Sequence, residues 1–226
     1  MTNNNTTKTL LLVPGAFSTS ATKMFSEVFE YNVTSDLNAV SSVDYVCFLG
    51  GADINPSLYG EESHPTTYYN RKRDFLEVSL WGKCREYDKP TIGICRGAQL
   101  LHALNGGKLW QDVQGHAGGN HLCYDTETGE SFESSSVHHQ MLRIPANPRF
   151  HLKAVSRSRL STTYETYGVV VTEDVPEVEA AYYLDTKCFL TQGHPEIGLP
   201  EYVKWFKRSW DEFLNKIERN QQACAA

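Results

Sequence analysis

The sequence predicts an α/β fold with three layers, in which a mostly parallel central sheet is flanked by helices. Short apolar, β-branched runs alternate with longer amphipathic segments along the chain, which is the pattern of strands and covering helices in such a sheet. One strand also runs directly into a helix at residues 91–104, with a polar residue at the junction. A chain of 226 residues is long enough to fill one such core. No repeat or low-complexity linker divides it, so we expect residues 1–226 to form a single domain.

The first half of the chain is expected to alternate strand and helix. Residues 9–13 are an apolar strand stopped by Pro14-Gly15, and residues 21–29 form a weakly patterned helix. Residues 43–49 are a buried strand closed by Gly50-Gly51, and a loop rich in Pro, Gly and Ser then extends to about Asn70. Apolar residues at helical spacing predict a helix over 74–87, which Lys89-Pro90 ends. A strand at 91–94 and a helix at 98–104 follow, and Gly106-Gly107 ends that helix.

The second half is expected to hold more strands and one long helix. Residues 111–135 are rich in Gly, His and acidic residues, so we expect a surface loop with one hairpin. Three β-rich segments follow at 167–172, 178–183 and 187–192. Pro200 begins the last helix. Its apolar stripe consists of Val203, Phe206, Trp210, Phe213, Leu214 and Ile217.

Composition and charge exclude several classes of protein. The net charge of −6 argues against a nucleic-acid-binding surface. No segment approaches the roughly 20 apolar residues that span a bilayer, and no signal-peptide core follows the polar N-terminus. We therefore expect no membrane association and a cytoplasmic location. The six cysteines are scattered without a CxxC pair, which fits that compartment.

Cys95 lies at the junction between the predicted strand and helix of residues 91–104. The sequence Gly93-Ile94-Cys95-Arg96-Gly97 has a glycine two positions to either side of the cysteine, which is the arrangement of a nucleophile elbow. The glycines let neighbouring backbone approach closely at a tight turn. The N-terminus of the helix favours a thiolate over a thiol. A chance motif around a buried cysteine remains the alternative at this point.

Two further segments supply groups that a cysteine nucleophile needs. His194 and Glu196 lie two residues apart after a predicted strand, so Glu196 can orient the imidazole of His194 as the base for Cys95. Gly50-Gly51 ends the strand that we expect beside the elbow. The backbone N–H groups of Gly51 and Arg96 are therefore the expected oxyanion hole. For each segment taken alone, an ordinary turn remains the alternative.

Together these segments resemble the class I glutamine amidotransferase superfamily, and within it most closely the γ-glutamyl hydrolase branch of cysteine peptidases. The resemblance runs from about Leu49 to Glu196 and rests on six pieces in the family's order. The pieces are Gly50-Gly51-Ala52-Asp53-Ile54-Asn55-Pro56-Ser57-Leu58-Tyr59-Gly60-Glu61, Arg73-Asp74, Gly93-Ile94-Cys95-Arg96-Gly97-Ala98-Gln99, Gly106-Gly107-Lys108-Leu109-Trp110-Gln111-Asp112, Ser136-Val137-His138-His139-Gln140 and Gln192-Gly193-His194-Pro195-Glu196.

The resemblance implies a flavodoxin-like fold and a role for each matching residue. It implies a catalytic triad of Cys95, His194 and Glu196 and an oxyanion hole at Gly51 and Arg96. It also implies that Gln99 helps to hold a glutamyl group, and that His138 and His139 are candidate substrate contacts.

The sequence departs from the family in two places. Gly193 stands where relatives often have an aromatic residue, which predicts a more open cleft wall and leaves substrate size open. About forty residues precede the Gly-Gly strand, which predicts a smaller sheet at that edge. The spacing of His102, His116 and His121 matches no zinc-ligand pattern, so no metal and no cofactor is expected.

Three functions are compatible with these residues. The first is a hydrolase that cleaves γ-glutamyl amide bonds of small-molecule conjugates or of glutamine, through a γ-glutamyl thioester on Cys95. The second is a glutaminase that supplies ammonia to a separate synthetase partner. The third is a non-catalytic binding or regulatory protein on the same fold. The segment from Gly50 to Glu61 favours the first. The amine half of the substrate, the pathway, and the choice between monomer and homodimer stay open.

Overall fold

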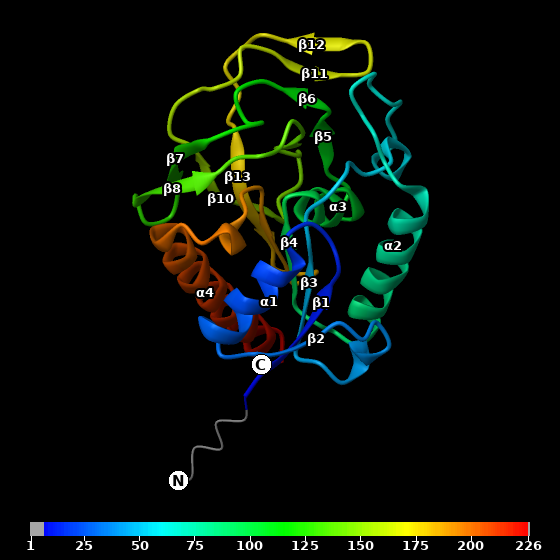
Figure 1. The fold of residues 1–226 in the computed structure, drawn as a ribbon, viewed down its shortest axis with the longest axis vertical. Helices are drawn as coiled ribbons and strands as arrows, with labels where there is room; N and C mark the ends of the chain where they lie inside the picture. Colours follow the sequence, from blue (N-terminus) through cyan, green and yellow to red (C-terminus); the bar gives the residue numbers. More distant parts are fainter. Residues whose placement is uncertain (1–6, 226) are drawn as a thin grey trace.

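The computed structural model describes residues 7–225 and confirms the predicted α/β fold (Figure 1). Its central sheet has nine strands in the order β2-β1-β3-β4-β14-β13-β10-β7-β8. The pairings from β2 to β14 are parallel, and those from β14 to β8 are antiparallel. The carboxyl ends of β3, β4 and β14 therefore meet at one edge, where ligands bind in sheets of this kind.

The elements have the following bounds. The central strands are β1 (Thr9–Val13), β2 (Asn32–Thr34), β3 (Tyr45–Phe48), β4 (Thr91–Ile94), β7 (Asn120–Asp125), β8 (Ser131–Ser135), β10 (Phe150–Ser156), β13 (Val178–Tyr183) and β14 (Cys188–Thr191). Two smaller sheets consist of β6 (Asp112–Val113), β11 (Tyr164–Thr166) and β12 (Val169–Val171), and of β5 (Lys108–Trp110) and β9 (Met141–Arg143). The helices are α1 (Ser18–Glu27), α2 (Arg71–Glu86), α3 (Arg96–Leu104) and α4 (Pro200–Ala225), with 3₁₀ turns at Ala39–Ser41, Pro56–Tyr59 and Pro195–Ile197.

The helices cover both faces of the sheet because successive strand residues point to opposite sides. In β1, Leu10 and Leu12 face the apolar cluster that α1 and α4 complete, whereas Leu11 and Val13 face the cluster that α2 and α3 complete. Figure 1 shows α1 and α4 on one side of the strands and α2 and α3 on the other. These two clusters form the two halves of the core.

Helix α4 contributes the largest side chains of the core. Trp205 and Trp210 are fully buried, and the indole of Trp205 stacks on Phe132 with 4.0 Å between ring centroids. The Trp205 indole N–H also donates to Asp125 at 2.8 Å. The predicted start at Pro200 is confirmed. The helix therefore fastens the β7–β8 hairpin to the sheet.

Other elements differ from the sequence prediction. The expected surface loop at 111–135 holds the β7–β8 hairpin, but β7 pairs with β10 and extends the central sheet. The strand β10 and the short strands β5 and β9 were not expected. The alternation of β10 is obscured because Lys153 is buried in it, paired with Asp125 at 3.1 Å.

The N-terminal edge of the sheet is short. The residues before β3 hold β1, α1 and β2, and β2 is an edge strand of three residues. The region before β3 is short, but it still supplies an edge strand, which has only three residues. Within residues 7–225, no helix is long and apolar enough to cross a membrane.

Candidate functional site

Cys95 occupies a sharp turn between β4 and α3. Its backbone has φ 52° and ψ −109°, a strained combination for a residue with a side chain. Its N–H donates to the carbonyl of Thr191 at 2.8 Å, which ties the turn to the end of β14. The flanking glycines are required by space, because a Cβ at Gly97 would lie 2.0 Å from the Phe48 oxygen and one at Gly93 2.6 Å from the Ala98 nitrogen. The predicted elbow is therefore present.

His194 and Glu196 follow β14 at the same edge of the sheet. The His194 Nδ1 lies 2.7 Å from Glu196 Oε1, and both side chains are buried. The backbone of His194 is held on both sides by Ser135, whose Oγ accepts from the N–H at 2.9 Å and donates to the carbonyl at 3.2 Å. The carboxylate thus fixes the imidazole so that its Nε2 is turned away from Glu196.

The imidazole of His194 lies beside Cys95 and the backbone of Gly50. A Cβ added to Gly50 would lie 2.6 Å from His194 Cε1 and 3.5 Å from the Cys95 Cβ. Burial lowers the pKa of His194, but hydrogen bonds with Cys95 and Glu196 outweigh burial and raise that pKa to about 10. A sulfur, an imidazole and a carboxylate therefore meet in one corner, which we call the cysteine corner (Cys95, His194 and Glu196).

Two backbone N–H groups of the strand ends around Cys95 have no hydrogen-bond partner in the described part of the chain. The Gly50 carbonyl accepts from Ala16 N–H and from Arg73 Nη2, each at 3.0 Å. The peptide between Gly50 and Gly51 is trans, so the N–H of Gly51 points the opposite way. Within residues 7–225, no hydrogen bond uses the N–H of Gly51 or of Arg96. Both donors are available to a ligand.

A network of four charged side chains, which the sequence analysis did not predict, packs behind the backbone that carries these two N–H groups. The buried guanidinium of Arg96 donates to Asp74 Oδ1 at 2.5 Å and to Glu77. Glu77 also accepts from Arg73 Nε at 2.7 Å, and Arg73 holds the Leu49 and Gly50 carbonyls. The Arg73–Glu77 spacing of four residues on a helix is the signal that could have indicated this network.

The predicted substrate contacts lie in different environments. Gln99 is buried, and its Nε2 donates to the Gln140 carbonyl at 3.2 Å. His139 is partly exposed between Asp53 and Asp112, and its hydrogen bond to Asp53 raises the pKa of its imidazole. His138 is buried and faces the interior, and burial lowers its pKa.

Gly193 does not open the cleft wall. A Cβ at this position would lie 2.2 Å from Ser134 Oγ and 2.7 Å from the Tyr202 hydroxyl. The space that an aromatic side chain would need is therefore filled by β8 and α4. The expectation of a more open wall is wrong at this position.

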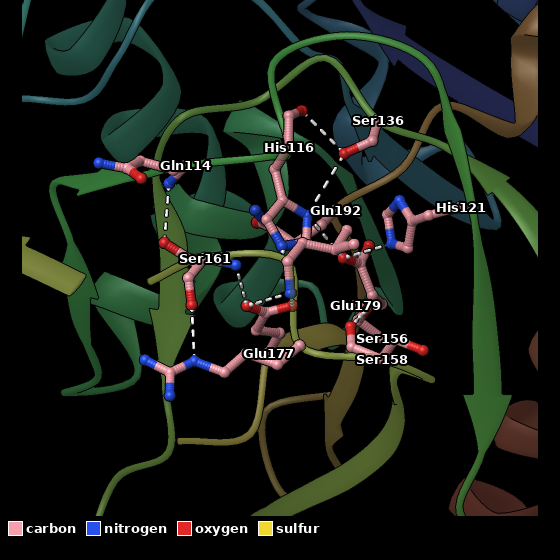
Figure 2. Close-up of polar contacts among 12 residues, drawn as sticks. Gln114, His116, His121, Ser136, Ser156, Ser158, Ser161, Glu177, Glu179 and Gln192 are labelled. Carbon is pink, nitrogen blue, oxygen red and sulfur yellow. Dashed lines mark hydrogen bonds and ion pairs between the residues drawn. The ribbon is translucent and has the colours of Figure 1, made fainter. Parts of the chain in front are cut away.

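The three histidines considered as zinc ligands separate into two places. His102 is buried beside Tyr183, whose hydroxyl lies 3.0 Å from its Nδ1. His116 and His121 instead lie beside Glu179 (Figure 2). His138 approaches the same carboxylate, with its Nε2 3.8 Å from Oε1. His116 was expected in a surface loop, but it is fully buried.

This fold is shared with solved structures of glutamine amidotransferase type. It matches a glutamine amidotransferase from Thermotoga maritima with a TM-score of 0.61 and 16% identity, over 94% of this chain and 86% of the other. It also matches a protein from Thermoplasma acidophilum that is provisionally named as part of a GMP synthase, with a TM-score of 0.62 and 16% identity, over 97% and 100% of the chains. The protein has the fold of the class I glutamine amidotransferase-like superfamily.

Sequence comparison identifies the family. Residues 29–196 match the model of the Peptidase C26 family, and the chain belongs to that family. It is 29% identical to a Mycobacterium tuberculosis protein provisionally named a glutamine amidotransferase, over 81% of this chain and 60% of the relative. It is 29% identical to protein NtpR of Enterococcus hirae, over 70% and 69%. A carbamoyl phosphate synthase small chain from Pasteurella multocida is 30% identical over 58% of this chain and 30% of its own length. The chain thus spans only part of each of these relatives.

Proposed function

We propose that the protein is a cysteine hydrolase that cleaves γ-glutamyl amide bonds, in γ-glutamyl conjugates or in glutamine, through a γ-glutamyl thioester on Cys95. The observation that carries the proposal is the cysteine corner, in which Cys95 lies on a strained turn beside an imidazole that Glu196 holds at 2.7 Å. Membership of the Peptidase C26 family supports a hydrolase of glutamine amidotransferase type. The γ-glutamyl specificity is the finer part of the proposal.

In the first step, the Cys95 thiolate attacks the carbonyl carbon of the γ-amide. The carbonyl oxygen becomes an oxyanion, which accepts hydrogen bonds from the N–H groups of Gly51 and Arg96. The His194 imidazolium donates its proton to the leaving nitrogen. The C–N bond breaks, ammonia or an amine leaves, and a thioester joins the glutamyl group to the sulfur.

In the second step, neutral His194 removes a proton from water, which attacks the thioester carbonyl. The same two N–H groups stabilise the second oxyanion. The C–S bond then breaks, glutamate leaves, and the thiolate–imidazolium pair is restored. Glu196 touches no reacting atom but keeps the ring oriented for both transfers.

Two predicted residues are assigned to the substrate side of the cleft. Gln99 and the partly exposed His139 are proposed to hold polar groups of the glutamyl half. His138 is buried, so any contribution to substrate binding passes through its neighbours Gln140 and Gln192, which lie 3.0 and 3.1 Å from its Nδ1. A single domain, a cytoplasmic location and the oligomeric state stay predictions.

The proposal is tested by replacing Cys95 with Ala and assaying a panel of γ-glutamyl amines together with glutamine. We expect the rate of glutamate release to fall by about 10⁴–10⁶, with the far-UV circular dichroism unchanged. Cys84→Ala is the matched control, because Cys84 is also buried and lies in α2 away from the elbow. Substantial hydrolysis by the Cys95→Ala protein would sink the proposal.

A second function, ammonia supply to a separate synthetase, is favoured by the carbamoyl phosphate synthase small chains among the relatives. That protein would release ammonia from glutamine and would act poorly on γ-glutamyl amines. Comparing kcat/KM for the two substrate types separates the alternatives.

A binding protein without catalysis is separated by labelling. A glutamine-analogue electrophile should modify Cys95 and none of the other thiols when the corner is reactive, as measured by peptide mass spectrometry. Equal labelling of several cysteines, or none, would favour the non-catalytic alternative.

A further inference from the structure

A second cluster of ionisable side chains lies outside the cysteine corner and is not used by the proposed reaction. Three imidazole nitrogens approach a single oxygen of Glu179, as Figure 2 shows in part. The Oε1 of Glu179 lies 3.3 Å from His116 Nδ1, 3.0 Å from His121 Nε2 and 3.8 Å from His138 Nε2. We call these four residues the histidine cluster.

We propose that His116, His138 and Glu179 bind a zinc-type divalent transition-metal ion. Candidate ligand atoms of these three residues all lie within 4.8 Å of one another. In a tetrahedral site with Zn–N and Zn–O bonds of about 2.0–2.1 Å, neighbouring ligand atoms are roughly 3.3–3.4 Å apart. The observed 3.3 and 3.8 Å from Glu179 to the two nitrogens therefore need only a small adjustment. Imidazole nitrogens and one carboxylate are ligands that suit zinc.

Buried polar atoms without partners point to the same place. The Nε2 of His138 and the Oε2 of Glu179 are both buried and have no hydrogen-bond partner within the described part of the chain. The His138 Nδ1 lies 3.0 Å from the Gln140 carbonyl, and a carbonyl can only accept. The Gln192 Nε2 lies 3.1 Å from the same Nδ1. In the tautomer that donates from Nδ1 to the carbonyl, the Nε2 lone pair is free to bind a metal ion. A cation bound between this nitrogen and the Glu179 carboxylate would give both unpartnered atoms a partner.

The surroundings of the ligands match those of metal sites. A metal-binding imidazole usually donates its other N–H to a carboxylate or a carbonyl. The Nε2 of His116 lies 3.1 Å from Glu177 Oε2, and His138 has the Gln140 carbonyl in the same role. Within residues 7–225, the ion-pair partners of Glu177 and Glu179 are all histidines. Glu177 also accepts hydrogen bonds from the backbone N–H groups of Leu160 and Ser161 and from the Tyr164 hydroxyl. A divalent ion bound here would compensate the negative charge of the two buried carboxylates.

His121 is assigned a positioning role. Its Nε2 is 3.0 Å from the same carboxylate oxygen, so it holds the Glu179 side chain toward the two ligand histidines. The side chain of His121 is 9% exposed, against 0–3% for the other three residues. An ion, and the water at its fourth coordination position, would therefore reach the site past His121. The ligands come from the segment before β7, the segment before β9, and β13. The ion would therefore fasten both segments to the sheet.

The test uses chain without an affinity tag, treated with a chelator and then equilibrated with zinc alone. We expect one zinc per chain by elemental analysis after gel filtration. Zinc at about 100 times its Kd should raise Tm by about 5–10 °C. Cobalt in place of zinc should give the strong visible absorption of tetrahedral coordination, and X-ray absorption should find nitrogen and oxygen neighbours at about 2.0–2.2 Å.

Variants separate ligands from neighbours. His116→Gln and Glu179→Gln should lose stoichiometric zinc, whereas His121→Gln should weaken affinity by about 10–100-fold. Cys123→Ser is the critical control, because Cys123 lies with His121 and Glu179 in a second set of candidate ligand atoms, and it should keep full affinity. His151→Gln, a histidine outside the cluster, should also be unchanged.

Several results would overturn the proposal. These are wild-type protein that binds no stoichiometric zinc, zinc retained at full affinity by His116→Gln, or zinc lost from Cys123→Ser. If a ligand variant does not fold, the wild-type cobalt spectrum and X-ray absorption decide, because sulfur or fewer than two imidazoles in the first coordination sphere excludes this ligand set.

Discussion

The cysteine corner and the histidine cluster both bring ionisable side chains together in buried positions, but they are assembled in different ways. The corner uses residues at the carboxyl ends of β4 and β14, adjacent strands whose register is fixed by parallel pairing. The cluster draws on the segment before β7, on β7 itself, on the segment before β9 and on β13. Residues at neighbouring strand ends can be recognised from short local sequence motifs. Residues that gather across the antiparallel half of a sheet cannot.

Among the variants that test this difference, Glu196→Gln in the cysteine corner is expected to have the largest effect. The variant keeps the shape of the side chain but loses the charge that orients His194, so kcat should fall by up to about 10⁴. The pKa of His194, raised to about 10 in the native protein, should drop. NMR titration of the histidine ring measures it, and zinc uptake by the cluster should not change.

The sign of the pH dependence follows from the raised pKa of His194. A raised folded-state pKa favours the protonated ring, so its contribution to stability is fully present below about pH 6.5, the unfolded value, and is lost as pH rises through about 10. In the wild type, kcat/KM should therefore fall as pH rises through about 10, because the proton donor to the leaving amine is lost. An alkaline limb near pH 7 would contradict the assignment.

A smaller effect is expected from Gly97→Ala, which tests whether the elbow depends on close backbone contact. The new Cβ would lie 2.0 Å from the Phe48 oxygen and 2.6 Å from its carbonyl carbon, and neither atom can move without shifting β3. We expect a loss of about 3 kcal/mol in the free energy of unfolding, measured by urea denaturation. A variant as stable as the wild type would show that α3 can move away from β3 without cost.

The smallest effect comes from Gly82→Ala, the matched control for that contact. Gly82 is exposed in α2, and a Cβ there would have no atom within 4 Å. The substitution should stabilise the protein by about 0.5–1 kcal/mol, because alanine favours helix over the unfolded chain. A loss of stability in the same urea experiment would mean that the contrast with Gly97 does not arise from packing.

Sequence reasoning found the elements whose signals are local. The strands at 9–13 and 91–94 and the start of the last helix at Pro200 are confirmed at the predicted residues, because each is an uninterrupted apolar pattern bounded by a turn residue. It missed β10, where the buried Lys153 breaks the alternation and is tolerated only through distant carboxylates. It also misjudged Gly193, whose small size is set by Ser134 and Tyr202 from other elements.

The same distinction applies to the functional residues. Glycine placement and short spacing mark Cys95, His194, Glu196 and Gly51 as candidates in the sequence, and the structure brings Cys95, His194 and Glu196 together. The sequence did not indicate that the Arg96 guanidinium is buried between Asp74 and Glu77. An arginine beside a nucleophile has no local sequence feature that shows whether its backbone or its side chain has a role. The spacing of His102, His116 and His121 predicts no zinc site. Spacing indicates only ligands that lie close together in the chain, so it does not reveal the histidine cluster.

The left-handed backbone at Cys95 has a consequence for how the protein tolerates change. A cysteine at φ 52° and ψ −109° carries strain of about 1–3 kcal/mol, which glycine would largely relieve because it has no Cβ. A Cys95→Gly chain should therefore be inert yet harder to unfold than the parent. Selection for stability alone would therefore favour the loss of Cys95. Only selection for catalytic activity would retain it.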